Sequence, residues 1–154
     1  MGVIYVDADA CPVREETMRV ATRHRVPVKM VCDGGIRPSA NPLVEVVIVA
    51  QGADAADDWI AERVAPGDLV ISADIPLADR CVKAGAEVLK PDGTVLDATT
   101  IGPALATRDL MADLRSADPF RQGGGKAFTK ADRSRFLNAM ENALRRASSK
   151  RTTP

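Results

Sequence analysis

The sequence predicts an α/β protein in which helices cover both faces of a mainly parallel sheet, a three-layer α/β/α sandwich. Short apolar runs rich in Val and Ile alternate with segments of helical periodicity, which is the pattern of such a sheet. Prolines and glycines stand where the helices would begin and end. With 154 residues, 45% of them hydrophobic, the chain can bury one sizeable core. We therefore expect a single domain over residues 1–147 and a disordered tail at 148–154.

The first half of the chain predicts three strands and two helices. Residues 3–6 are apolar without a break, which is typical of a strand buried on both faces. Pro12 suits the first turn of a helix running to Arg25, because its missing N–H would have no partner there. The next expected elements, in order, are a strand at 26–32, a loop at Gly34-Gly35, a strand at 43–49 and a helix at 54–64 that ends before Pro66-Gly67.

The middle of the chain continues the alternation and then forms a hairpin. A strand at 68–72 leads to a helix that begins at Pro76 and ends at Gly85. Two short strands follow at 87–90 and 94–96, joined by a Pro-Asp-Gly turn. This order favours a sheet with one antiparallel edge.

Two helices close the domain. The first covers residues 101–114, and the glycine-rich segment 118–126 separates it from the second. This segment is either a flexible connector or a mobile basic lid that contacts phosphates through Arg121 and Lys126. The last helix begins with Thr129 and docks on the domain through one apolar face, which carries Phe136, Met140, Ala143 and Ala147.

Composition indicates an intracellular protein. No apolar stretch approaches the roughly 18 residues of a membrane span, and the first residues lack the pattern of a signal peptide. Cys11, Cys32 and Cys81 are too widely separated for a zinc site or a disulfide framework, so we expect reduced thiols. The single histidine, His24, stands between two arginines and is expected at a solvated helix end. We expect a cytoplasmic protein that does not associate with membranes.

The net charge of zero hides an asymmetry along the chain. Residues 1–114 hold 11 Lys/Arg and 18 Asp/Glu, a net charge of −7, whereas residues 115–154 hold 10 and 3, a net charge of +7. An acidic catalytic part beside a basic segment would suit a nucleic-acid substrate. A solvated basic helix with a frayed tail would produce the same asymmetry without any such function.

The most informative local feature is the pair Asp7 and Asp9, at the end of the first predicted strand. Ligands of open α/β sheets bind beyond the carboxyl ends of the strands, and side chains two residues apart in a strand point to the same side. Two neighbouring negative charges repel each other, and a divalent cation relieves this repulsion. The alternative is that Asp9 caps the following helix while its neighbour is solvated.

Further acids stand at comparable places. Asp74 ends the strand at 68–72 before a proline-started helix, which repeats the setting of Asp7, and Asp54 and Asp58 lie one turn apart at a helix start. We expect Mg²⁺ or Mn²⁺, which prefer carboxylate oxygens, to bind Asp7, Asp9, Asp54, Asp58 and Asp74. Asp7 and Asp74 would be the catalytic acids of phosphodiester hydrolysis.

Two more groups of side chains accompany these acids. Candidates for hydrogen-bonding and orienting the metal ligands are Ser72, Asp57 and Asp79. Acids in a first helical turn are also favoured by the helix dipole alone. The candidate phosphate-binding side chains are Arg14, Arg80, Arg121, Lys126 and Arg133. Exposed helical arginines are more often only solvated.

Four segments carry a family resemblance: residues 7–12 (DADACP), 52–60 (GADAADDWI), 71–78 (ISADIPLA) and 128–136 (FTKADRSRF). Together they resemble the YaiI/YqxD family, also called UPF0178 or DUF188, over nearly the whole chain. This bacterial family is similar to PIN-like nuclease domains. The resemblance implies a PIN-like α/β/α sandwich with acids around a magnesium or manganese site. We expect RNA before DNA as the nucleic-acid partner, although the sequence itself does not distinguish the two.

Matched by position, Asp7 resembles the first strand-end acid of the family. Asp54 or Asp58 resembles the acid at the helix start. Asp74 resembles a member of the later pair of acids, and Asp79 is a further candidate for that pair. One departure is Gly125, which stands where we expect a proline in relatives. It leaves the shape of the glycine-rich segment open more than the acidic site.

Two other functions fit parts of the pattern. A haloacid-dehalogenase-like phosphatase would use Asp7 as its nucleophile and Asp9 as acid and base, but Cys11 departs from its motif and the chain is short for that fold. A non-catalytic nucleic-acid-binding module would keep the fold and the metal without cleavage. The sequence does not fix the oligomeric state.

Overall fold

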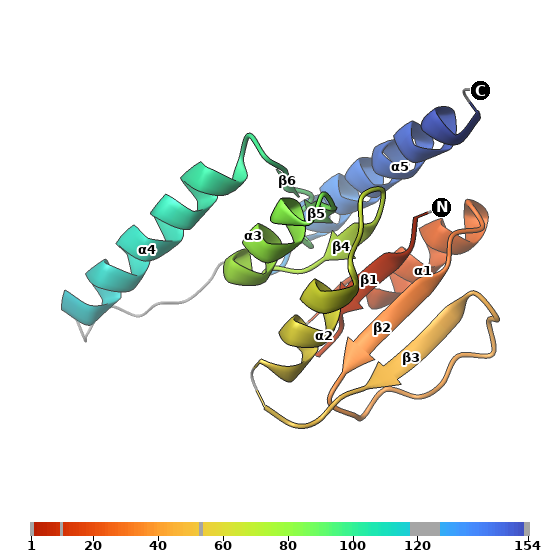
Figure 1. Cartoon of the computed structure of the whole chain (residues 1–154), viewed down its shortest axis with the longest axis horizontal. Helices are drawn as coiled ribbons and strands as arrows, with labels where there is room; N and C mark the ends of the chain where they lie inside the picture. Colours follow the sequence, from red (N-terminus) through yellow and green to blue (C-terminus); the bar gives the residue numbers. More distant parts are fainter. Residues whose placement is uncertain (1, 10, 53, 118–126, 153–154) are drawn as a thin grey trace.

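A computed structural model describes residues 2–9, 11–52, 54–117 and 127–152 (Figure 1). Its centre is one six-stranded sheet of order β3-β2-β1-β4-β5-β6. The first five strands pair in parallel, and β6 is antiparallel to β5. The bounds are β1 Ile4–Asp7, β2 Val28–Cys32, β3 Val44–Ile48, β4 Leu69–Ile71, β5 Glu87–Leu89 and β6 Val95–Leu96. The predicted parallel sheet with its antiparallel edge is confirmed.

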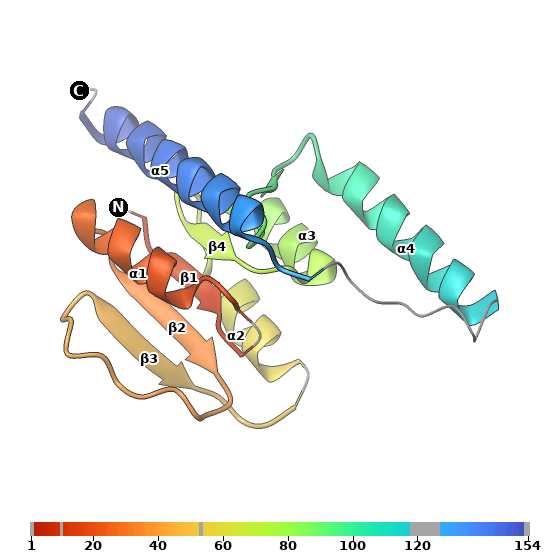
Figure 2. The same ribbon diagram turned by 180° about the vertical axis from the view of Figure 1, so that it is seen from behind.

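Helices cover both faces of this sheet. Figure 1 shows α2 and α3 on one face, and Figure 2, from behind, shows α1 and α5 on the other. The bounds are α1 Arg14–Arg23, α2 Ala55–Arg63, α3 Ile75–Lys83, α4 Ile101–Ala117 and α5 Lys130–Thr152. The architecture agrees with the predicted three-layer α/β/α fold.

The strand β1 supplies both layers of the core. Ile4 and Val6 belong to the cluster under α1 and α5, whereas Tyr5 between them belongs to the cluster under α2 and α3. Successive side chains of a strand point to opposite faces, so a strand covered on both sides is apolar throughout. This explains the unbroken apolar run at the start of the chain.

The helix α5 docks through the predicted apolar face. Phe136 and Met140 are fully buried, and Ala143 and Leu144 are buried beside them. Gly93, in the turn between β5 and β6, adopts a left-handed φ of 94°. A Cβ there would lie 2.7 Å from the backbone carbon of Arg135 in α5, so the turn can approach the helix this closely only with glycine.

Two expectations need correction at the contact between α1 and α5. His24 is not solvated: its side chain is only 19% exposed and forms a hydrogen bond with Glu141 of α5. In addition, α5 continues to Thr152, so residues 148–152 are helical where we expected the disordered tail to begin. No glycine or proline interrupts the sequence between residues 130 and 152, and the helix therefore has no local reason to stop at 147.

The helix α4 extends away from the sheet (Figure 1). Its first residue, Ile101, is buried in the cluster under α2 and α3, whereas Leu110 and Met111 are exposed. The glycine-rich segment 118–126 follows it. This segment, with Arg121, Lys126 and Gly125, lies outside the described residues, so the lid and the connector both remain predictions.

Candidate functional site

The candidate site lies where β1 and β4 end side by side. Val6 pairs with Ile71, which brings Asp7 and Ser72 to neighbouring positions at the carboxyl edge of the sheet. From here the chain leaves in opposite directions, to α1 on one face and to α3 on the other (Figures 1 and 2). Such a switch point leaves an opening between the two connections, and ligands of α/β folds bind there.

Ser72 links the two strand-end acids. Its buried hydroxyl donates a hydrogen bond to Oδ2 of Asp7 at 3.1 Å and accepts one from the backbone N–H of Asp74 at 3.0 Å. Asp74 is the N-cap of α3, where its Oδ1 accepts from the N–H of Leu77 at 3.0 Å. The fold therefore fixes both carboxylates at this edge, as the repeated strand–acid–proline pattern predicts.

The electrostatics of Asp7 reflect crowding by negative charge. Burial raises the pKa of its carboxyl above the ordinary value, and the charges of Asp74 and Asp9 raise it further, while the hydrogen bond from Ser72 opposes the shift. None of the ion pairs among the described residues includes Asp7, Asp57 or Asp74. The three carboxylates thus form a region of uncompensated negative charge.

Asp57 of α2 is the third member of this group. From the sequence we expected Asp54 and Asp58 as metal ligands, and Asp57 only as a residue that supports them. Burial, the charges of Asp74 and Asp7, and a side-chain hydrogen bond with Asp74 raise the pKa of Asp57 to about 6. Its neighbour Ala56 is buried against the sheet, so Asp57 flanks the inward face of the helix. Its place next to Ala56, which packs against the sheet, is the sequence signal that could have identified Asp57.

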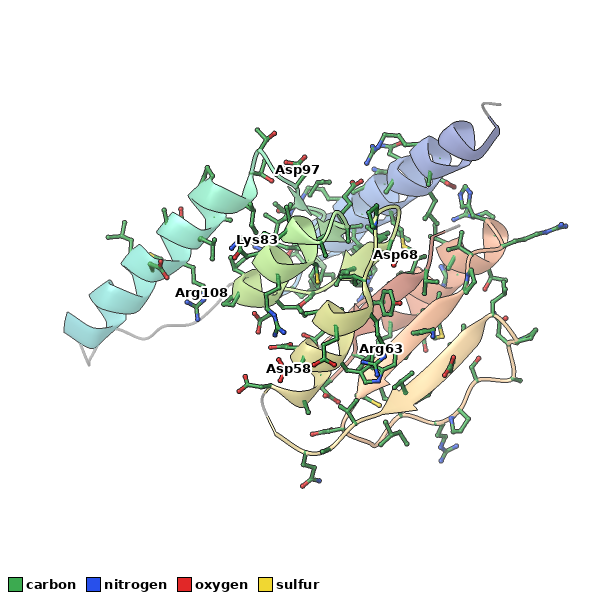
Figure 3. All side chains as sticks on the ribbon, in the orientation of Figure 1. Asp58, Arg63, Asp68, Lys83, Asp97 and Arg108 are labelled. Atoms are coloured by element: carbon green, nitrogen blue, oxygen red, sulfur yellow. The ribbon has the colours of Figure 1, made fainter. Side chains whose placement is uncertain are left out.

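Asp54 and Asp58 do share one face of α2, but it is the outer face. Asp58, which is labelled in Figure 3, is exposed and forms a 2.8 Å ion pair with Arg80 of α3. Asp54 is exposed at the N-cap position and makes no side-chain cap. The structure thus brings Asp58 to Arg80 and does not bring it to the crowded acids Asp7, Asp57 and Asp74.

Asp9 lies at the margin of the site. It is exposed, and both of its oxygens lie 3.2 Å from the backbone N–H of Asp33, which follows β2. It does not cap α1, because that helix begins with Val13 as its N-cap and has no side-chain cap. Asp9 instead ties the connection after β1 to the loop after β2.

The remaining predicted residues are dispersed. Asp79 pairs with Lys83 at 2.8 Å in α3. Arg133 pairs with Glu16 at 3.4 Å and lies over the ring of Phe128, so it fastens α5 to α1. Arg14, the first residue of α1, lines a cavity beside the loop after β2.

The three cysteines are free. Burial raises the pKa of the Cys11 thiol to about 11 and that of Cys81 to about 12. A thiol with such a pKa stays protonated at neutral pH, and the thiolate is the reactive form. Cys11, although it follows Asp7 and Asp9 closely, packs against the core cluster under α1 and α5, and its raised pKa disfavours the thiolate.

The described residues hold no preformed metal cage. Nowhere in ranges 2–9, 11–52, 54–117 and 127–152 do three acidic, histidine or cysteine side chains come close enough together to bind an ion among them. Asp7, Asp57 and Asp74 thus offer one or two ligands at a time. Magnesium commonly binds in this way, through one or two carboxylates with waters and substrate phosphates as its other ligands.

A family model described as "Uncharacterized BCR, YaiI/YqxD family" (DUF188) matches residues 5–146. The chain belongs to the YaiI/YqxD family. It is 63% identical over 147 residues to a UPF0178 protein of Roseobacter denitrificans. The aligned residues cover 96% of this chain and 97% of that relative. A UPF0178 protein of Rhodopseudomonas palustris strain BisB5 is 54% identical over 151 residues, 98% of this chain and 92% of the relative. No solved structure matches the chain.

These comparisons confirm the family that the four segments suggested. The YaiI/YqxD match includes every member of the acidic group, because Asp7, Asp57 and Asp74 all lie within residues 5–146. Among the helices of the described residues, none combines the length and apolar character that a membrane span requires.

The raised pKa of Asp57 predicts an unusual pH dependence in this YaiI/YqxD protein. A carboxyl whose pKa is raised in the folded state favours folding at low pH, and this contribution is lost as the pH rises from the ordinary value of 3.8 through about 6. In EDTA, Asp57→Asn should therefore be more stable than the wild type at about pH 7.5, with the advantage gone by about pH 4. Urea denaturation at the two pH values measures the difference.

Asp58→Asn is the matched control for this prediction. It removes a neighbouring carboxylate of the same helix, but one that is exposed and paired with Arg80. Loss of an exposed pair costs only about 0–1 kcal/mol, so this variant should be equal to or slightly less stable than the wild type at about pH 7.5. If Asp57→Asn were also no more stable than the wild type at about pH 7.5, burial and the charges of Asp7 and Asp74 would not raise the pKa of Asp57 as stated.

Proposed function

We propose that this protein is a nuclease that hydrolyses phosphodiester bonds with Mg²⁺ or Mn²⁺, with RNA as the expected substrate. The proposal rests on one observation: Asp7, Asp57 and Asp74 gather at the switch point between β1 and β4, and the described part of the chain places no basic side chain in an ion pair with them. The alternation of strands and helices supplies the scaffold but by itself says nothing of chemistry.

The donor set fits a hard divalent cation. All three side chains offer carboxylate oxygens, which Mg²⁺ and Mn²⁺ prefer over nitrogen or sulfur ligands. Burial and mutual repulsion raise the pKa of Asp7 and Asp57, and a nearby cation would favour the charged forms instead. One or two of Asp7, Asp57 and Asp74 would hold the ion, with waters and substrate phosphate oxygens as its other ligands. Asp9 and Asp54 would lie at its periphery, where water-mediated contacts are common.

The side chains have distinct tasks in this proposal. When bound, the ion would polarise the phosphate and lower the pKa of a bound water. Ser72 holds Asp7 in place through its 3.1 Å hydrogen bond, and Asp74 is fixed by its cap to Leu77. Both anchors keep the carboxylates oriented before substrate arrives, which reduces the reorganisation that catalysis requires.

A nucleic-acid substrate also agrees with the charge distribution. Residues 115–154 carry a net charge of +7, and α5, which holds most of these basic residues within the described part, lies on the same face of the sheet as α1 (Figure 2). Lys and Arg side chains provide the salt-dependent part of nucleic-acid affinity.

Incubation of the protein with internally labelled RNA and DNA, in Mn²⁺ and in EDTA, tests this function. Cleavage should require the metal, be abolished in Asp7→Asn/Asp74→Asn, and be retained in Asp58→Asn, whose side chain pairs with Arg80. If the wild type and the double variant were equally inert or equally active, the proposal would fail.

Two other outcomes would identify the competing functions. Affinity for RNA in EDTA that falls steeply with salt, without cleavage in Mn²⁺, would indicate a binding module. Release of phosphate from a monoester, with a covalent phosphate trapped on Asp7, would indicate a phosphatase.

A further inference from the structure

Lys90 is the first residue after β5, at the same edge of the sheet as the acidic site. Asp7 and Ser72 lie side by side across β1 and β4, and the pairing of Ile71 with Leu89 places Lys90 on the other side of Ser72 (Figure 1). The backbone N–H of Ser72 donates to the carbonyl of Leu89 at 3.3 Å, so this pairing continues one residue past β4. Asp7, Ser72 and Lys90 therefore form one row across three neighbouring strands.

The Lys90 side chain points to the face of the sheet that holds the acids. Val70 and Val88 both belong to the core cluster under α2 and α3. Successive side chains of a strand alternate between the two faces, so Ser72 and Lys90, two residues further on, return to that face. Ser72 meets the carboxylate of Asp7 there.

The hairpin between β5 and β6 fixes the backbone of Lys90 and leaves its charge without a partner. The N–H of Lys90 donates to the carbonyl of Thr94 at 2.9 Å, and its carbonyl accepts from the N–H of Gly93 at 2.9 Å. The nearest acid along the chain, Asp92, accepts from the N–H of Thr94 instead. None of the ion pairs among the described residues includes Lys90. Its half-buried side chain can therefore offer the ammonium group to a ligand.

The row sets the spacing between this cation and the acids. Neighbouring strands lie about 4.8 Å apart, so Asp7 and Lys90 are separated by two spacings, roughly 9.6 Å, at the backbone. A metal ion beside Asp7 would hold the phosphate that is cut. The ammonium group, on its flexible four-carbon stem, would then lie beside the following phosphate, which lysine binds as a point charge.

We propose that Lys90 binds the substrate phosphate next to the one that is cut, and that the nucleic-acid strand therefore lies across β4 toward β5. The inference rests on the proposed function for the identity of the acidic site. It adds a requirement on the substrate, because a dinucleoside monophosphate has a bond to cut but no second phosphate for Lys90.

Steady-state kinetics in Mn²⁺ test this role with Lys90→Met, which keeps the length of the side chain and removes its charge. For an RNA oligonucleotide the KM should rise at least about ten-fold, as expected for loss of a hydrogen bond to a charged group. The kcat should be unchanged, because the contact is the same in the ground state and the transition state. Cleavage of a dinucleoside monophosphate should be unaffected, and Lys90→Arg should keep most of the affinity for the oligonucleotide.

Arg19→Met is the matched control. It removes an exposed cation from α1, which covers the other face of the sheet (Figure 2), and the KM for the oligonucleotide should stay close to that of the wild type. Lys90→Met should also unfold at the same temperature as the wild type, because no ion pair is lost. A KM that rose equally in both variants would indicate a general effect of charge and overturn the assignment of Lys90.

Fluorescence anisotropy in EDTA separates this inference from the proposed function. For a labelled single-stranded oligonucleotide, Lys90→Met should lower the slope of log affinity against log salt by about 0.7, the value for one phosphate contact. This change without any cleavage by the wild type in Mn²⁺ would support the role of Lys90 and overturn the nuclease. Cleavage by the wild type, with an unchanged KM and salt slope in Lys90→Met, would overturn the role of Lys90 alone. An equal loss on the dinucleoside monophosphate would also overturn it, because Lys90 would then act at the cut bond.

Discussion

Asp7→Asn is expected to lower the rate of metal-dependent hydrolysis by about 10²–10³-fold, the loss associated with one preorganised electrostatic group. Asp7 ends the central strand of the sheet, and its position is set by the neighbouring strand β4 through Ser72. Asparagine keeps the shape and can still accept the Ser72 hydrogen bond, but it carries no negative charge for a cation. The rate of cleavage of labelled RNA at saturating Mn²⁺ measures the effect.

The same substitution should not unfold the protein. In the folded state burial and the charges of Asp74 and Asp9 raise the pKa of Asp7, so the ionised carboxylate opposes folding as the pH rises above the ordinary pKa. Asparagine removes that cost, and the variant in EDTA at neutral pH should be at least as stable as the wild type. An active Asp7→Asn protein would exclude Asp7 from the chemistry.

Ser72→Ala is the companion variant for Asp7→Asn. It removes the hydroxyl that orients Asp7 and accepts the N–H of Asp74, but it leaves every carboxylate in place. We expect a loss of about 10–100-fold in metal affinity or activity, the usual effect of removing a group that orients a ligand. A rate restored by higher Mn²⁺ would indicate such a positioning role, whereas Asp7→Asn should not recover in this way.

Phe136→Ala is expected to reduce the free energy of unfolding by about 3–5 kcal/mol. Phe136 is fully buried in the cluster that joins α5 to α1 and the sheet. Alanine would leave a cavity in this cluster, and the surrounding side chains can fill it only in part. Because small domains are stable by only about 5–15 kcal/mol, this loss is a large share of the total. Urea unfolding followed by circular dichroism measures it.

Arg146→Ala is the control for the docking of α5. Its guanidinium forms a 2.8 Å ion pair with Glu87 of β5, and both side chains are at least one third exposed. Such pairs contribute about 0–1 kcal/mol, so this variant should be much more stable than Phe136→Ala. If the two were reversed, surface charge and not the apolar face would hold α5 on the sheet.

The local elements follow from the sequence because their causes are local. The unbroken apolar run at residues 3–6 reflects a strand buried on both faces, and Pro76 lies in the first turn of α3 as predicted. Asp7 and Asp74 also meet as expected, since parallel strands end at the same edge of a sheet and the residues after them must lie together. The family and the general fold were accessible on the same grounds.

The exact members of the acidic group depended on tertiary structure. Periodicity places Asp54 and Asp58 on one face of α2, but it does not say which face of the helix packs against the sheet. In the structure the buried residues of α2 are Ala56 and Ile60. With this face inward, Asp57 interacts with Asp74, and Asp58 pairs with Arg80. His24 gave no sequence signal of its contact with Glu141, which lies 117 positions further along the chain. The sequence determined which segments become strands and helices and which acids stand at their ends, because those properties depend on neighbours in the chain. Packing decided which carboxylates face one another, because burial and charge act between residues that only folding brings together.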